Sequence, residues 1–436
     1  MTQRTRSILG IAAVLLLVAS VFAATYISRA VPVGTAYFAK VLCSEVFVSG
    51  RPPEDVLAID LALDNPIVQG IEVDVDTERQ RVSASLRGFF ASTAVHREGL
   101  GCSLAIEVTP EELSSQTLAG TAPRPPRPWP EDDEDAVEPA APEIDVERLR
   151  QAVDGAFFEP DPDRPRRTRA IVVVHDGELV AERYAPGFDA EMPLTGWSMT
   201  KSVTNALVGI LVEQGRLDVQ APAPVPEWQD DEDPRAAVTL DQLLWMSSGL
   251  DFDETYGDPG ADVQQMLFRR PSAAAFAAAM PLRTPPGSEW SYSSGTSNIV
   301  SRIVRKTVEA AGEDYWTFPR RALFEPLGMT SATLEPDASG TFVGSSFCFA
   351  TARDWARFGL LYLGDGVWEG ERILPPGWVE YSTTPTPRSN GRYGAHFWLN
   401  ADADGSERRW PGLPADLYMM SGFEGQWVYV VPSKQA

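Results

Sequence analysis

Histidine and cysteine are scarce in this chain, which has three of each among its 436 residues. His96, His175 and His396 show no metal-ligand spacing with one another or with a cysteine. The sequence therefore predicts no metal site and no cofactor. A Gly-x-Ser-x-Gly turn is also lacking, because the stretch Gly196–Thr200 fails at its last position, and nothing in the sequence supports a Ser-His-Asp triad.

Positive charge is in deficit as well. The chain has 37 Lys and Arg against 61 Asp and Glu, which gives a formal net charge of −24. Such a chain repels polyanions, so nucleic acid and anionic lipid are discounted as partners. The remaining composition is that of an ordinary globular protein, and the length allows a large core plus an appended module.

Residues 1–30 carry a targeting signal. Arg4 and Arg6 precede an apolar stretch over Ile8–Ile27, and about 20 such residues can span a bilayer as a helix. The basic flank predicts that the N-terminus stays in the cytoplasm. We favour an uncleaved anchor with the catalytic body outside the cytoplasm, in the periplasm. The alternative is a cleaved signal peptide and a secreted protein, because Val21–Ala23 and neighbouring residues offer small side chains.

Residues 31–120 are predicted to form a small β-rich module with no chemistry of its own. Alternating apolar and polar residues predict strands at 70–75 and 81–86, with a third at 104–108. Cys43 and Cys102 flank this segment in an oxidising compartment, so we expect them to form a disulfide. Cys348 is then unpaired and is expected to be a small buried residue.

Residues 121–145 are rich in proline and acid and predict an extended linker, which leaves 146–436 as the large domain. Asp176-Gly177 between two apolar runs predicts a β-hairpin over 170–184. Helices and strands mixed in this way indicate an α+β fold. Helices are predicted at 198–214, 239–246, 296–311 and 351–364, with a last strand at 426–431.

Ser198-Met199-Thr200-Lys201 places a serine and a lysine three residues apart at the start of a predicted helix. This spacing puts both side chains on one helix face. Burial lowers the pKa of a lysine, so Lys201 could accept the Ser198 proton. A second candidate is Tyr292, which follows a Pro-Gly turn just before another helix, where a phenol can relay a proton to a leaving group.

The Ser198-x-x-Lys201 motif and Tyr292-Ser293-Ser294 together resemble the first two motifs of the serine β-lactamase and penicillin-binding protein superfamily. Their order and context are similar to the class C branch, and most similar to 6-aminohexanoate-dimer hydrolase-like proteins. The resemblance covers about 165–436. Further matching stretches are 239–250, 324–329 and 352–359.

The resemblance implies an antiparallel sheet flanked by helices, an all-helical subdomain beside it, and the site between them. It implies that Ser198 is acylated, that Lys201 is the base and that Tyr292 shares proton transfer. Ser294 stands where the family often has an asparagine that contacts the substrate. The oxyanion hole would use the backbone N–H groups of Ser198 and Gln426, and removing one such donor typically costs ~10²–10³ in rate.

The third family motif departs from its usual pattern, since Phe423 replaces the cationic residue in the stretch Ser421–Gln426 while Gly425 is kept. This departure disfavours recognition of a penicillin-type carboxylate. Trp197, Ser294, Phe423 and Glu424 are the candidate substrate-binding residues. The chain also stops soon after this strand, where the family continues, so we expect an incomplete C-terminus.

Three functions are weighed. The first is an exported hydrolase of a small ester or amide, the second is a β-lactamase or penicillin-binding enzyme acting on D-Ala peptides or β-lactams, and the third is a non-catalytic sensor. The intact set Ser198, Lys201 and Tyr292 argues against a sensor, and Phe423 argues against the second function. The sequence therefore favours the ester or amide hydrolase.

Overall fold

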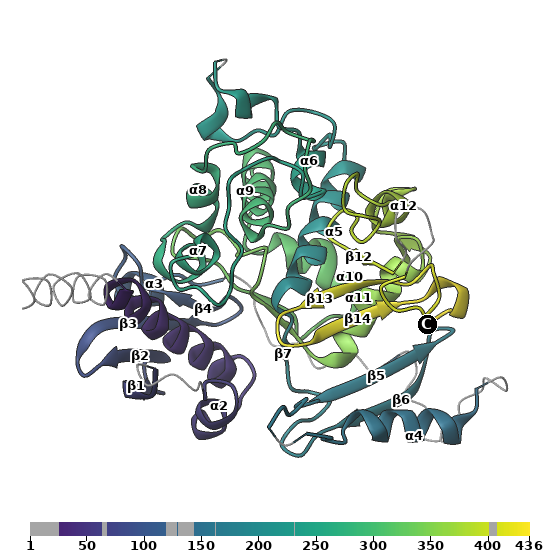
Figure 1. The fold of residues 1–436 in the computed structure, drawn as a ribbon, viewed down its shortest axis with the longest axis horizontal. Coiled ribbons are helices and arrows are strands. Elements are labelled where there is room, and N and C mark those ends of the chain that lie inside the picture. The colour runs from purple at the N-terminus through teal and green to yellow at the C-terminus, as the bar shows by residue number, and fades with distance from the viewer. Residues whose placement is uncertain are drawn as a thin grey trace, which may run out of the picture.

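The computed structural model describes residues 26–62, 68–118, 129, 144–161, 163–230, 232–400 and 408–436. Figure 1 shows a smaller N-terminal part, in purple and blue, against one side of a larger part that runs from teal to yellow. The apolar stretch predicted as an anchor lies almost wholly outside the described residues. The predicted linker does too, apart from Trp129 and its last two residues.

The N-terminal part combines helices with a four-stranded antiparallel sheet in the order β1-β2-β3-β4. Two of the three predicted strands are confirmed. The third is wrong, because β4 ends at Leu104 and Glu107 has a positive φ of 59°. The elements are a helix over Tyr26–Phe47, α2 (Pro53–Ile59), a 3-10 turn at Val68–Gly70, β1 (Ile71–Asp76), β2 (Arg81–Leu86), β3 (Phe89–Arg97), β4 (Gly101–Leu104) and α3 (Pro110–Ser114).

The helix Tyr26–Phe47 corrects the expected β-rich character of this module. It is long and apolar enough to cross a membrane, but 67% of its most apolar 18-residue window is buried inside the protein. Leu42 and Ala39 are fully buried. The part of this helix that packs in the module is therefore a core helix.

Buried polar contacts join the module to the large domain. Cys43 on the helix and Cys102 on β4 form a disulfide. Lys40 pairs with Glu335 of the large domain, and both side chains are buried. The Cys102 N–H donates to the same carboxylate at 2.6 Å. A buried ion pair is costly to break, so the module is a fixed neighbour of the large domain.

The large domain begins with α4 (Val146–Ala156) and a hairpin of β5 (Ala170–His175) and β6 (Glu178–Tyr184). The hairpin was predicted, and its turn residues Asp176 and Gly177 have φ angles of 52° and 83°, as a type I′ turn requires. The remaining elements are β7 (Leu194–Thr195), α5 (Thr200–Glu213), α6 (Leu240–Leu244), α7 (Asp262–Arg269), α8 (Ala273–Ala278), α9 (Ser294–Ala310), α10 (Glu325–Leu327), β8 (Thr333–Leu334), β9 (Cys348–Ala350), α11 (Ala352–Leu363), β10 (Val367–Trp368), β11 (Glu371–Arg372), α12 (Trp378–Thr383), β12 (Trp398–Leu399), β13 (Tyr418–Gly422) and β14 (Gln426–Val430).

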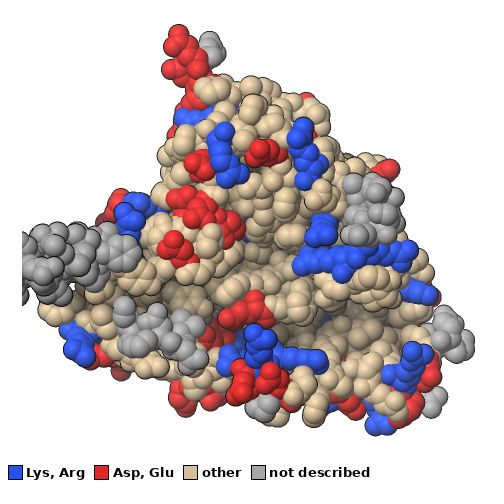
Figure 2. All heavy atoms as spheres, in the orientation of Figure 1, with Lys and Arg blue, Asp and Glu red and all other residues tan. Residues whose placement is uncertain are grey.

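Strands and helices occupy different regions of this domain. Helices α6, α8 and α9 lie in the upper part of Figure 1, with α7 below α8, and Figure 2 draws the same view with all atoms as spheres. Helix α11 packs against both β5 and β14. The expected single sheet is not seen in the described residues, where the strands divide into β5-β6, β7-β9-β8, β10-β11 and β12-β13-β14. No described strand bridges β5 and β14, and α11 links them instead.

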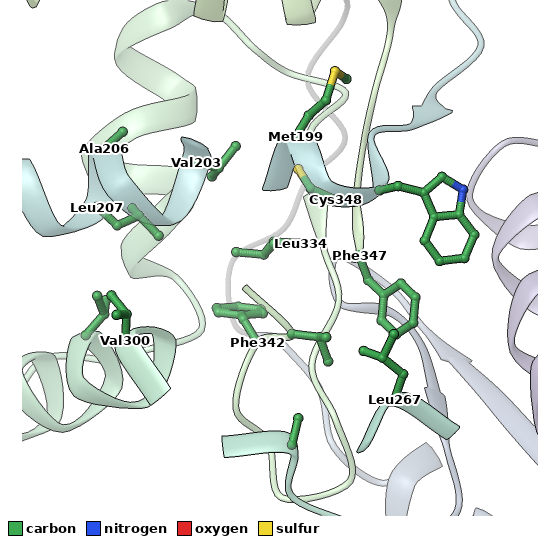
Figure 3. Packing of buried hydrophobic residues seen from close by; sticks show 14 of the residues in the cluster. Met199, Val203, Ala206, Leu207, Leu267, Val300, Leu334, Phe342, Phe347 and Cys348 are labelled. Carbon is green, nitrogen blue, oxygen red and sulfur yellow. The ribbon is translucent and has the colours of Figure 1, made fainter. Parts of the chain in front are cut away.

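Helix α5 runs through the middle of the core. Figure 3 shows Leu207 of α5 pointing toward Val300 of α9 and Phe342, which belong to the same buried cluster as Val203 and Ala206. Twelve of its fourteen residues, Thr200 to Leu211, are buried. A helix buried on all sides has a fixed N-terminus, which is where the predicted nucleophile lies.

Candidate active site

Ser198 lies in a short 3-10 turn, Trp197–Met199, that leads directly into α5. The turn is held from both sides. The Gly196 N–H donates to Cys348 O of β9 at 2.8 Å, and a Cβ added to Gly196 would come within 2.4 Å of the Trp355 ring. Trp197 has a φ of 44°, in the left-handed region. Residues in this region persist only where the surroundings impose them, so the turn holds Ser198 in a defined position.

The ammonium group of Lys201 lies 3.1 Å from Ser198 Oγ and donates to Ser294 Oγ and Ser345 O, each at 3.0 Å. Burial of the side chain lowers the pKa of Lys201 from 10.5 to about 8, and the Glu254 carboxylate partly opposes this shift. A lysine with this pKa is partly neutral near pH 7, which a proton acceptor requires.

Tyr292 is half-buried beside the same lysine, whose ammonium lies 4.8 Å from the centre of the phenol ring. The ring stacks on Trp398 at 5.4 Å and meets Tyr393 edge-on at 5.8 Å. Burial raises the pKa of Tyr292 well above 10, and the nearby Ser198 hydroxyl partly opposes the rise. The phenol therefore keeps its proton at neutral pH, so it can donate or relay a proton but is not itself a phenolate base.

Glu254 and Tyr256 complete the cluster, and the sequence reasoning missed both. Tyr256 OH donates to Glu254 Oε1 at 2.9 Å and lies 3.4 Å from Ser294 Oγ. Ser294 itself is completely buried and bonds to Lys201 and Glu254. The only sequence signal for Glu254 and Tyr256 was their position, a few residues after the stretch 239–250 that resembles the family.

The tip of the β13–β14 hairpin reaches the nucleophile turn. A Cβ added to Gly422 would come within 2.1 Å of Gly196 O, so the two backbones are in close contact. Gly422 pairs with Gln426 across the hairpin, which places the predicted second oxyanion donor in this strand pair.

Phe423 projects from this tip and is 40% exposed. Its ring stacks on Tyr256 at 5.5 Å and meets Trp197 edge-on at 5.7 Å. Trp197 is itself mostly buried. Phe423 therefore presents an apolar, partly open surface beside the residue that precedes Ser198.

Glu424 has a different environment. It has a φ of 57° at the hairpin turn. Its pKa is raised by partial burial and by Asp60, while Arg169 and Arg167 oppose the rise. Asp60 belongs to the N-terminal module, so the charge environment of Glu424 comes from the module boundary.

His396 does not replace Lys201. Its Nδ1 lies 2.8 Å from Lys201 O, its Nε2 lies 3.1 Å from Ser297 Oγ, and the ring is buried. Burial lowers the pKa of His396 to about 3. Both ring nitrogens are therefore engaged in buried contacts with α5 and α9. Among the described residues, no group of three or more His, Cys, Asp or Glu side chains could hold a metal ion.

Comparison with known proteins identifies the family of this chain. The sequence model of the β-lactamase family matches residues 150–436. The 6-aminohexanoate-dimer hydrolase of Paenarthrobacter ureafaciens is 30% identical over 264 residues, which cover 56% of this chain and 64% of that enzyme. The chain thus spans somewhat less than two thirds of that relative.

Two solved structures share the fold. A family VIII carboxylesterase superimposes with a TM-score of 0.52 and 17% identity, covering 68% of this chain and 90% of the other. A penicillin-binding protein homologue from Caulobacter crescentus superimposes with a TM-score of 0.50 and 21% identity, covering 67% and 90%.

Proposed function

The chain belongs to the β-lactamase family of serine hydrolases, and we propose that it cleaves an ester or non-peptide amide through an acyl-enzyme on Ser198. The observation that carries this proposal is the 3.1 Å contact between Ser198 Oγ and the buried amine of Lys201. The similarity to a 6-aminohexanoate-dimer hydrolase supports an amide as one substrate class.

Acylation begins with neutral Lys201, which takes the proton from Ser198 Oγ as that oxygen bonds to the substrate carbonyl carbon. The N–H groups of Ser198 and Gln426 stabilise the negative oxygen of the tetrahedral intermediate. When the intermediate collapses, Tyr292 gives its proton to the leaving alcohol or amine and takes one from Lys201. The product of this step is an acyl ester on Ser198 and a free leaving group.

Deacylation runs the same proton path in reverse. A water adds to the acyl carbonyl and gives a proton to the Lys201–Tyr292 pair. The intermediate collapses with release of the carboxylic acid, and Ser198 Oγ regains a proton. Ser294, Glu254 and Tyr256 are positioning residues in this scheme, because they bond to Lys201 or to one another. This placement favours a positioning role for Ser294 over the substrate contact that the family resemblance implied.

Substrate recognition is assigned to the exposed face of Phe423, beside the turn that carries Ser198. Phe423 offers apolar surface there, next to the mostly buried Trp197, which suits an uncharged acyl or leaving group. A β-lactam or D-Ala peptide is the second candidate, supported by the fold it shares with a penicillin-binding protein homologue. It is disfavoured because Phe423 stands where the family pattern has a cation.

We assign the hydrolase domain to the outside of the cytoplasmic membrane. Arg4, Arg6 and the apolar stretch Ile8–Ile27 support an anchor, and the Cys43–Cys102 bridge suits an oxidising compartment. A cleaved segment would give a secreted form of the same enzyme.

One experiment tests the chemistry. The full chain is incubated with a fluorophosphonate and, separately, with a labelled penicillin, and adducts are mapped by mass spectrometry. We expect a fluorophosphonate adduct on Ser198 that is lost in Ser198→Ala and retained in the control Ser288→Ala. A penicillin adduct on Ser198 would support the second candidate. An adduct on another serine, or no adduct in folded protein, would refute the mechanism.

A further inference from the structure

Large apolar side chains are exposed at the turn between β2 and β3. Arg87 and Gly88 form a two-residue turn with φ angles of 51° and 79°. Phe89 is 72% exposed and Phe90 is 46% exposed. Adjacent large apolar side chains that stay exposed mark a surface with a partner.

The hairpin runs alongside the N-terminal helix. Thr35 Oγ1 donates to Phe90 O at 2.8 Å, and the ring of Phe47 lies 5.6 Å from the ring of His96. Helix and strand β3 therefore run in the same direction, over about 18 Å and about 20 Å between these contacts. The turn that precedes Phe89 must then point back along the helix, toward Tyr26.

The start of the helix has the same character as the hairpin tip. Tyr26 and Ile27 are exposed, at 43% and 39%. Arg29 is exposed too, as is Arg87 in the hairpin turn. Aromatic, aliphatic and arginine side chains in one patch are the composition found at the boundary between lipid headgroups and acyl chains.

We propose that the tip of the β2–β3 hairpin inserts into the headgroup region of a zwitterionic bilayer, as a second membrane contact beside the N-terminal segment. This inference rests on the membrane location proposed above. The apolar stretch Ile8–Ile27 ends where the described helix begins, so this end of the module meets the bilayer if the stretch spans it. The net charge of −24 makes a zwitterionic surface the better fit than an anionic one.

The second contact would fix the orientation of the hydrolase domain. A single helix lets a domain rotate about the membrane normal and tilt, whereas two contacts on one rigid module restrict the tilt. The module is held to the hydrolase domain by the buried Lys40–Glu335 pair. The Ser198 site would therefore keep a set height and direction relative to the bilayer.

A fluorescent label reports the contact directly. Phe89→Cys in the full chain is labelled with nitrobenzoxadiazole, since Cys348 is buried and the other two cysteines are bridged. The matched control is Phe158→Cys, because Phe158 is also highly exposed, at 68%, but lies in the hydrolase domain after α4. Both proteins are reconstituted in phosphatidylcholine vesicles with and without doxyl-labelled lipid.

We expect the label at position 89 to shift to the blue and to be quenched strongly by doxyl lipid, while the label at 158 stays open to aqueous iodide. Equal iodide access at both positions would overturn the hairpin contact. A blue shift without quenching by doxyl lipid would show a second copy of the chain on the patch and would also overturn it. Flotation of the unlabelled chain separates the two proposals: a chain that fails to float overturns the membrane location itself.

Discussion

Glu254 accepts two hydrogen bonds from Ser294, one from the backbone N–H at 2.8 Å and one from the hydroxyl at 2.5 Å. Ser294 is also an acceptor for Lys201. The carboxylate is therefore linked to the Lys201 amine through one serine, and its negative charge raises the lysine pKa that burial lowers. Glu254 sets the balance between a neutral and a charged lysine.

The first prediction is a pH dependence with a defined sign. Lys201 accepts a proton only when it is neutral, so kcat/KM should rise with pH and level off above the lysine pKa of about 8. Glu254→Gln removes the charge that raises this pKa, so the rising limb should move to lower pH. Asp253→Asn removes an exposed neighbouring charge and should leave the limb in place. A profile of Glu254→Gln that moves to higher pH would contradict the assignment.

The second prediction concerns the base. Lys201→Arg should lose about as much activity as Lys201→Ala, a factor of ~10²–10⁴ or more, because a guanidinium does not give up its proton. Steady-state rates on a short p-nitrophenyl ester measure the loss. Lys40→Arg is the matched control, since Lys40 is equally buried but pairs with Glu335 in the module boundary.

Full activity in Lys201→Arg would contradict the Ser-Lys mechanism and would favour a histidine as the base. The structure predicts otherwise, because both ring nitrogens of His396 already contact Lys201 O and Ser297 Oγ. His396→Asn should therefore reduce stability more than the rate per folded molecule. Asparagine tolerates the φ of 64° at this position better than most residues.

The elements that sequence patterns predicted well are local ones. The hairpin β5–β6 follows from Asp176-Gly177 between apolar runs, and α5 follows from its apolar spacing and Gly215. The Ser-x-x-Lys motif was visible because Ser198, in the turn before α5, and Lys201, in the first turn of α5, are three residues apart. Such features need no knowledge of the rest of the chain.

Features that depend on tertiary contact were not predicted. Glu254 and Tyr256 lie in a loop of ordinary polarity, and they become part of the site only because the fold brings that loop to Ser294, about 40 residues away. Hydropathy also could not show that the helix Tyr26–Phe47 is mostly buried in protein, because a bilayer and a protein core select the same apolar residues. Strand β3 was also missed, because its first residues are exposed.

The third prediction concerns the Cys43–Cys102 disulfide, which closes a separation of 59 residues. Replacing both cysteines with alanine should lower the free energy of unfolding by about 2–5 kcal/mol, because the unfolded chain gains freedom. Thermal unfolding with and without reductant measures the effect. Reductant should lower the Tm of the native chain and of Cys348→Ala, but not that of the double variant. A native Tm that does not respond to reductant under unfolding conditions would show that the bridge is absent.

The last prediction tests why the third motif lacks its cation. Phe423 stands between Tyr256 and Trp197, beside the turn that carries Ser198, where a lysine would place a positive charge within reach of a substrate carboxylate. Phe423→Lys should therefore increase the rate of acylation by a penicillin and decrease kcat/KM for an uncharged ester. Stopped-flow acylation and ester hydrolysis measure the two rates on the same preparation.

Trp427→Lys is the matched control for this substitution. Trp427 is 52% exposed on the same hairpin, so it introduces the same charge at an exposed aromatic position outside the Trp197–Tyr256 contact. Its two rates should stay near those of the native chain. If Phe423→Lys and Trp427→Lys change the penicillin rate equally, the effect is a general electrostatic one. If Phe423→Lys does not change the rate of ester hydrolysis, Phe423 does not contact the substrate and the apolar recognition surface must lie elsewhere.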